Sequence, residues 1–174
     1  MHIAVLSASD VAQYKEIMLH AYEHAADAFT STPAERKKET DAWWIDRIAD
    51  PTGLKIAFGA FIHADLVGTV ALEFSAKQKT KHKALLIGMY VLPNYRKHGL
   101  ARLLVQKVIG HCQSRGDILA IQLEATEGNN AAISLYHSLG FSQFGTEPFG
   151  LLTSSGYRAK VHLWLGIGAP QNAG

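Results

Sequence analysis

The sequence contains only one cysteine, Cys112, among its 174 residues. A single cysteine excludes an intramolecular disulfide and fits a reducing compartment. Its place among helically spaced apolar residues predicts a core position rather than a nucleophile. Long apolar runs are also missing, because polar residues interrupt every hydrophobic segment well before the ~20 residues that a membrane span needs. We therefore expect a cytoplasmic protein with no signal peptide and no membrane partner.

An excess of one charge sign is absent too. Lysine and arginine number 17 against 15 acidic residues, for a formal net charge of +2. This balance gives no reason to expect nucleic acid as a partner. With 48% hydrophobic and 18% charged residues, the composition predicts one globular domain over residues 1–166. Residues 167–174, rich in Gly, Ala and Pro, are expected to form a flexible tail.

Several motifs of other protein classes are missing. Neither G-x-G-x-x-G nor G-x-x-x-x-G-K-[ST] occurs, which disfavours a generic nucleotide-binding α/β domain. No Ser-His-Asp or Cys-His arrangement stands out at a recognisable spacing. His20 and His24 lie one helical turn apart, but no carboxylate or cysteine completes a ligand set, so we expect no metal.

The most informative stretch runs from Leu85 to Gly140. Its first segment, Leu85–Val91, is continuously apolar, which predicts a buried strand that ends at Pro93. A basic turn containing Gly99 follows and leads into a helix. The first N–H groups of a helix lack intrahelical acceptors and carry the positive end of its dipole, so this turn suits a phosphate.

At this turn, Arg96-x-x-Gly99-x-Ala101 resembles the Arg/Gln-x-x-Gly-x-Gly/Ala motif of the GNAT superfamily of acetyl-CoA-dependent N-acetyltransferases. A second block, from Leu123 to Phe141, resembles the other coenzyme-binding half of that fold. Together the blocks cover about the last half of the chain. The resemblance implies acetyl-CoA as cosubstrate, bound by Met89, Tyr90, Val91, Arg96, Lys97, His98, Gly99, Leu100, Ala101, Arg102, Asn129, Ala132 and Tyr136.

The first half of the chain predicts a strand at His2–Leu6 and a helix that starts from the capping-box pattern at Ser7 to Asp10. A second helix is expected from Thr32, followed by Pro33, to about Asp50. Two apolar segments, Lys55–Ile62 and Leu66–Phe74, predict an antiparallel hairpin.

In the second half, the helix after Gly99 should bury one face, a strand should follow, and a short helix should run from Asn129 or Asn130 to Ser138. Two final strands flank a Gly-containing loop. We therefore predict a mixed α/β fold of the α+β type, with a largely antiparallel central sheet flanked by helices. The buried face of the long helix is Leu100, Leu103, Leu104, Val108 and Cys112; the last three strands are Ile118–Leu123, Phe141–Phe144 and Tyr157–Leu165.

The family resemblance also implies that the fourth and fifth strands splay apart to admit the pantetheine arm of the coenzyme. Gly88 lies within the fourth strand, where a glycine often marks a bulge or a close backbone approach. A bulge here would free backbone N–H groups for the thioester oxygen. The alternative is a plain core glycine.

Amine acetylation by direct attack requires a neutral amine, stabilisation of an oxyanion and a proton for the leaving thiolate. By resemblance Tyr136 is the general acid, and a phenol is protonated at neutral pH. Glu73, which we prefer, and Glu124 are the candidate bases, although either can instead be an exposed strand carboxylate. Tyr136 can equally be an aromatic on the apolar face of its helix.

The acceptor pocket of this fold is built from the first two helices and the last hairpin loop, here Glu147 to Leu152. Phe29, Trp43 and Glu147 are therefore our candidate acceptor-binding residues. The acceptor is a small-molecule amine or a peptide or protein amine, and a homodimer is a candidate assembly. The alternative function is a noncatalytic acyl-CoA sensor, which would not need Tyr136.

Overall fold

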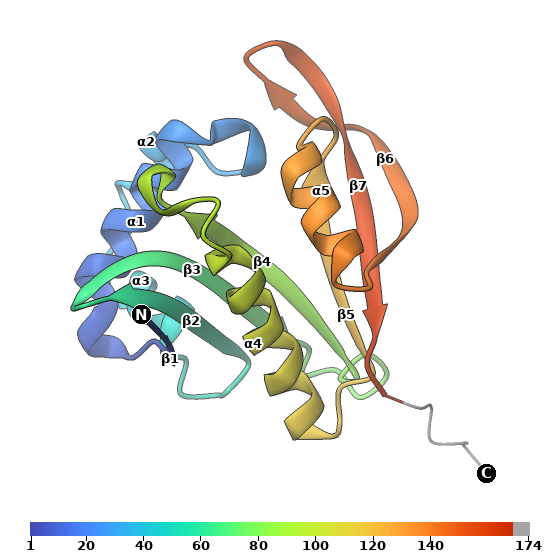
Figure 1. The fold of residues 1–174 in the computed structure, drawn as a ribbon, viewed down its shortest axis with the longest axis horizontal. Coiled ribbons are helices and arrows are strands. Elements are labelled where there is room, and N and C mark those ends of the chain that lie inside the picture. The colour runs from blue at the N-terminus through green and yellow to red at the C-terminus, as the bar shows by residue number, and fades with distance from the viewer. Residues whose placement is uncertain (169–174) are drawn as a thin grey trace.

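The computed structural model describes residues 1–168 and shows one seven-stranded sheet with helices on both faces (Figure 1). The strand order is β1-β2-β3-β4-β5-β7-β6, and every neighbouring pair is antiparallel except β4–β5. The strands are β1 (His2–Val5), β2 (Lys55–Ile62), β3 (Asp65–Phe74), β4 (Lys83–Val91), β5 (Ala120–Thr126), β6 (Ser142–Thr153) and β7 (Gly156–Gly166). This arrangement confirms the predicted fold class.

Within the described part of the chain, five α-helices and three short 3-10 turns connect the strands. The helices are α1 (Val11–His24), α2 (Pro33–Arg36), α3 (Asp41–Ile48), α4 (Leu100–Arg115) and α5 (Asn130–Ser138), and the turns are η1 (Ala8–Asp10), η2 (Ala26–Ala28) and η3 (Pro93–Tyr95). Within residues 1–168, no helix combines the length and the apolar character that crossing a membrane requires.

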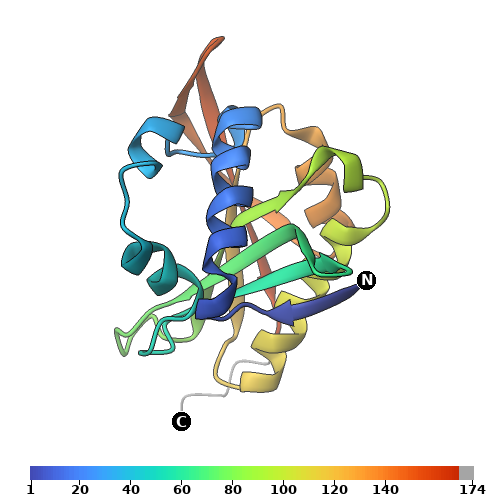
Figure 2. The same cartoon turned by 90° about the vertical axis from the view of Figure 1, so that its left-hand side faces the viewer.

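The two faces of the sheet have separate cores. Helices α1 and α3 pack on one face, where Tyr14 and Met18 meet Trp44, and Figure 2 shows α1 lying across the strands. Helix α4 packs on the other face through Leu104 and Val108. The prediction that Leu103 faces the core was wrong, because Leu103 is 38% exposed. The buried face of α4 includes Val105 instead.

The prediction of one helix from Thr32 to Asp50 was also wrong. The helix does start after Thr32, which forms a capping box with Glu35, but α2 ends at Arg36. A second cap follows, in which the Thr40 hydroxyl accepts a hydrogen bond from the Trp43 N–H and begins α3. A threonine hydroxyl can accept a hydrogen bond from a free N–H of a helix start wherever the threonine lies in a polar segment. Thr40 therefore begins a new helix instead of continuing the first one.

The last hairpin differs from its prediction as well. Glu147 to Leu152 belong to β6 rather than to a loop, and the chain reverses at Ser154 and Ser155. The register of β6 shifts twice, between Gln143 and Gly145 and between Glu147 and Leu151. These shifts interrupt the regular alternation of side chains from which a strand is predicted. Beyond β7, the Ile167 N–H still donates to the Leu119 carbonyl, whereas residues 169–174 of the predicted tail lie outside the described residues.

Cys112 provides a test of the core around α4. Its side chain is fully buried, and burial raises the pKa of the thiol to about 11. Because only the thiolate is reactive, native protein should react with a disulfide reagent at pH 8 about 100-fold more slowly than unfolded protein. Absorbance stopped-flow in buffer and in guanidinium measures both rates. Rapid stoichiometric labelling of the native protein would contradict the packing described here.

Candidate active site

The candidate site begins where β4 and β5 separate. The two strands pair in parallel over three positions only, from Lys83 opposite Ala120 to Leu85 opposite Gln122. Beyond these positions β5 continues to pair with β7 as far as Thr126 opposite Lys160, while β4 continues along β3. The predicted splay between the fourth and fifth strands is thus confirmed, and it leaves backbone groups of both strands free to bind a ligand.

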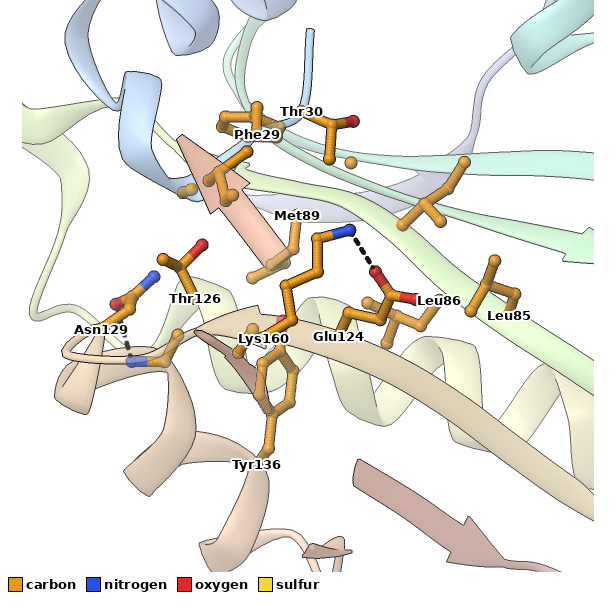
Figure 3. A pocket seen from close by; sticks show the side chains of 16 residues that line it. Phe29, Thr30, Leu85, Leu86, Met89, Glu124, Thr126, Asn129, Tyr136 and Lys160 are labelled. Carbon is orange, nitrogen blue, oxygen red and sulfur yellow. Dashed lines mark hydrogen bonds and ion pairs between the residues drawn. The ribbon is translucent and has the colours of Figure 1, made fainter. Parts of the chain in front are cut away.

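The splay opens into a cavity of about 240 Å³ (Figure 3). Strand β4, strand β5, α5 and the segment around η2 line it, together with two side chains of the β6–β7 hairpin. The Thr126 hydroxyl donates to the Asp27 carbonyl at 2.6 Å and so ties β5 to η2 at the rim. The lining residues are 28–30, 85–89, 124–126, Asn129, Ala132, Tyr136, Leu151 and Lys160.

A bulge shapes the β4 wall of this cavity. Thr69 of β3 faces Tyr90, but Ala71 faces Ile87, so β4 carries an extra residue at this point. Gly88 has φ +62°, a left-handed conformation that favours glycine. A Cβ at Gly88 would approach only the Met18 Cε, at 3.9 Å, so the glycine is needed for its backbone rather than for space. The bulge predicted at Gly88 is confirmed.

The basic turn before α4 has the geometry of an anion site. Lys97 and Gly99 have φ of +66° and +79°, and left-handed residues in a tight turn direct successive N–H groups to one side. Gly99 caps α4, and the Leu103 N–H donates back to its carbonyl at 3.1 Å. The N–H groups of Leu100, Ala101 and Arg102 remain outside the helical ladder, as at any helix start.

Arg96 is fixed beside this turn. Its Nε donates to the Val91 carbonyl at 2.9 Å, and its guanidinium lies 5.3 Å from the centre of the Tyr90 ring. The Arg102 guanidinium instead donates to the Ser138 hydroxyl at 2.7 Å, which joins α4 to α5 across the splay. Asn129 caps α5 by accepting from the Ala132 N–H and also lines the cavity, where the resemblance predicts that it binds the coenzyme.

Tyr136 extends from α5 into the cavity (Figure 3). It is 5% exposed, and its ring packs against Phe141 with the ring centres 5.7 Å apart. Burial raises the pKa of its phenol well above the usual value near 10. The hydroxyl therefore keeps its proton at neutral pH and can donate it to a stronger base that forms nearby.

A charged cluster adjoins the cavity, and two of its members, Glu124 and Lys160, line it. The Lys160 ammonium donates to the Glu124 carboxylate at 2.7 Å. His162 lies between two carboxylates, with Nδ1 3.8 Å from Glu124 and Nε2 3.3 Å from Glu147. The strand registers bring these side chains together, because Glu124 faces His162 and Glu147 faces Lys160.

The predicted acceptor residues do not all reach this cavity. Phe29 lines it, and Glu147 reaches its charged cluster through His162. Trp43 does not line it, since its ring packs between the guanidinium groups of Arg36 and Arg47, at 4.5 and 4.9 Å.

Two further predicted residues also point elsewhere. Glu73 faces Leu85, on the closed side of the splay, and does not line the cavity. The Tyr90 hydroxyl pairs with the His20 ring at 2.9 Å, so its side chain belongs to the core beneath α1.

The sequence analysis did not identify Lys160 as a site residue, and only the β5–β7 register would have revealed it. Among residues 1–168, no three His, Cys, Asp or Glu side chains gather as a metal site.

The comparison with known protein families supports the GNAT resemblance found in the sequence. The model of the acetyltransferase (GNAT) family matches residues 18–141, and the chain belongs to that family. The fold is similar to that of yncA from Salmonella typhimurium, whose structure was determined with its cofactor acetyl-CoA. That structure is 22% identical with a TM-score of 0.80, and the alignment covers 99% of this chain and 98% of yncA.

Two curated relatives align over shorter regions. The [ribosomal protein bS18]-alanine N-acetyltransferase of Salmonella typhimurium is 36% identical over 70 residues, which is 40% of this chain and 47% of that enzyme. The L-amino acid N-acetyltransferase AaaT of Escherichia coli is 29% identical over 107 residues, or 62% of this chain and 65% of AaaT. The chain thus spans about half the length of the first relative and about two thirds of the second.

Proposed function

We propose that the protein is an N-acetyltransferase that moves the acetyl group of acetyl-CoA to a primary amine by direct attack within a ternary complex. The observation that carries the proposal is the cavity at the β4–β5 splay, which is lined by both Tyr136 and Glu124. The left-handed turn at Gly99 suits the pyrophosphate, and the free edges of the splayed strands suit the pantetheine arm.

The groups of the cavity match the steps of the reaction. The neutral amine attacks the thioester carbon, and the backbone of the Gly88 bulge supports the oxyanion that forms. The C–S bond then breaks, and the Tyr136 hydroxyl gives its proton to the leaving thiolate. The amine proton must leave as well. For a lysine-like acceptor the ammonium form costs about 4–5 kcal/mol at pH 7, but for the α-amine of a peptide only about 1 kcal/mol.

Glu124 is now the better candidate for the base, because it lines the cavity and Glu73 does not. If Glu124 relays the amine proton, Glu124→Gln should lower kcat/KM most at low pH, where the acceptor is mainly an ammonium ion. The loss should shrink as the pH approaches the pKa of the acceptor. Thiol release measured from pH 6 to 10 gives the two profiles.

Glu73→Gln is the matched control, since it removes a second carboxylate outside the cavity. Its profile should run parallel to that of the wild type. A pH-dependent loss in Glu73→Gln, with none in Glu124→Gln, would return the role to Glu73. Parallel profiles for both variants would assign the proton to bulk water.

The overall proposal is tested by following thiol release from acetyl-CoA with a broad panel of amines. The names of the relatives justify including both free amino acids and peptides that begin with alanine. Tight binding of acetyl-CoA without transfer to any amine would support the noncatalytic sensor instead. A homodimer and a cytoplasmic location stay predictions, which sedimentation and cell fractionation test.

A further inference from the structure

Lys160 is held in the cavity wall by the backbone of the hairpin. Its side chain is 16% exposed and lines the cavity, and Figure 3 shows it extending toward Glu124. Gly150 makes room for it, because a Cβ there would lie 2.8 Å from the Lys160 Cγ and 2.9 Å from its backbone nitrogen. Gly150 sits in the register shift between Glu147 and Leu151. The bulge in β6 therefore shapes the surroundings of this lysine.

The Glu124–Lys160 pair presents two opposite charges to the same small cavity. The ammonium has three N–H donors, and one of them is used by Glu124 at 2.7 Å. The Glu124 carboxylate is 42% exposed and can accept further hydrogen bonds. Each member of the pair can therefore bind a ligand group of opposite charge, while Lys160, at 16% exposure, is less stable if it loses its counter-charge.

Resting on the function proposed above, we infer that the acceptor is a free α-amino acid, bound as its zwitterion. Its α-ammonium replaces Lys160 at Glu124, and its α-carboxylate binds the Lys160 ammonium. The exchange leaves every charge paired, which a simple amine or a peptide N-terminus cannot do because neither has a carboxylate next to the amine. One ion pair of the protein thus selects an acceptor that carries both charges.

The reaction itself favours product release at this pair. The α-ammonium first loses one proton to solvent through Glu124, and the neutral amine then attacks the thioester carbon. As the C–S bond breaks, the thiolate takes the Tyr136 proton, and the second proton lost by the nitrogen restores the Tyr136 phenol as the amide forms. The product, an N-acetyl amino acid, keeps its carboxylate but has lost the positive charge that Glu124 held. Glu124 can then pair with Lys160 again, and that pairing competes with the product carboxylate for the ammonium.

The test compares each L-amino acid with its amide and with the amine that lacks the carboxylate, all followed by thiol release. The best free acid should have a kcat/KM about 10- to 100-fold above its amide, which is the discrimination expected from one charge-assisted contact. Lys160→Met should bring this acid-to-amide ratio close to one, and Lys160→Arg should keep most of it. Lys15→Met is the matched control, because Lys15 pairs with Asp41 at 3.0 Å outside the cavity and its loss should leave the ratio unchanged.

The outcomes separate this inference from the proposed function. Transfer to amides or simple amines as fast as to the free acids would overturn the inference and leave the acetyltransferase proposal standing. A ratio that survives in Lys160→Met would also overturn it. Absence of both acetyl-CoA binding by calorimetry and thiol release with any amine would overturn the proposed function itself. If Lys160→Met does not fold, the wild-type ratio and Lys160→Arg still decide.

Discussion

Tyr136→Phe is expected to lower kcat by about 10²- to 10⁴-fold, the usual contribution of a general acid. The substitution removes only the hydroxyl, so the packing of the ring against Phe141 and the affinity for acetyl-CoA should be preserved. Steady-state kinetics should therefore show the loss in kcat, with calorimetric binding of acetyl-CoA nearly unchanged. In the proposed mechanism the effect is large because Tyr136 holds the proton for the leaving thiolate at a fixed position.

The pH dependence provides a second check on Tyr136. A phenol donates only while it is protonated, that is, below its pKa, and burial moves this pKa upward. Wild-type activity should thus show no alkaline loss attributable to the acid up to about pH 9. A Tyr136→Phe variant with full kcat would assign the tyrosine to packing alone and favour protonation of the thiolate by solvent.

Gly99→Glu is expected to weaken acetyl-CoA binding by about 100-fold or more. Gly99 starts α4, where free N–H groups and the helix dipole favour an anion, so a carboxylate there repels the pyrophosphate. Isothermal titration with acetyl-CoA measures the change. Unchanged affinity would contradict the placement of the pyrophosphate at this turn.

Two control variants separate charge from backbone strain at Gly99. The residue has φ +79°, so any side chain costs conformational energy, although a Cβ would meet no atom within 4 Å. Gly99→Ala carries the strain without the charge and should weaken binding far less. Gly110→Glu adds the same charge in the middle of α4, where space is also open and φ is ordinary, and should bind acetyl-CoA like the wild type.

The amino-acid sequence by itself determined the elements whose patterns are local. The apolar run of β4 predicted a strand, Gly99 and its basic neighbours predicted an anion-binding helix start, and the Asn129-Asn130 pair predicted the start of α5. These features depend on residues close in the chain, such as a hydroxyl or amide side chain that satisfies a nearby N–H. The same local rule failed at Thr40, because a second good cap inside one polar segment splits a helix that a single cap would have extended.

Only the tertiary structure decided which side chains share the cavity. Side chains on neighbouring strands meet according to strand register, and register depends on bulges and partners far away in sequence. Glu73 and Glu124 look alike as strand carboxylates, yet the three-residue pairing of β4 with β5 places only Glu124 beside the opening. Lys160 lies 36 residues from Glu124, and it reaches that carboxylate because β7 pairs with β5 and bulges in β6 leave room for its stem.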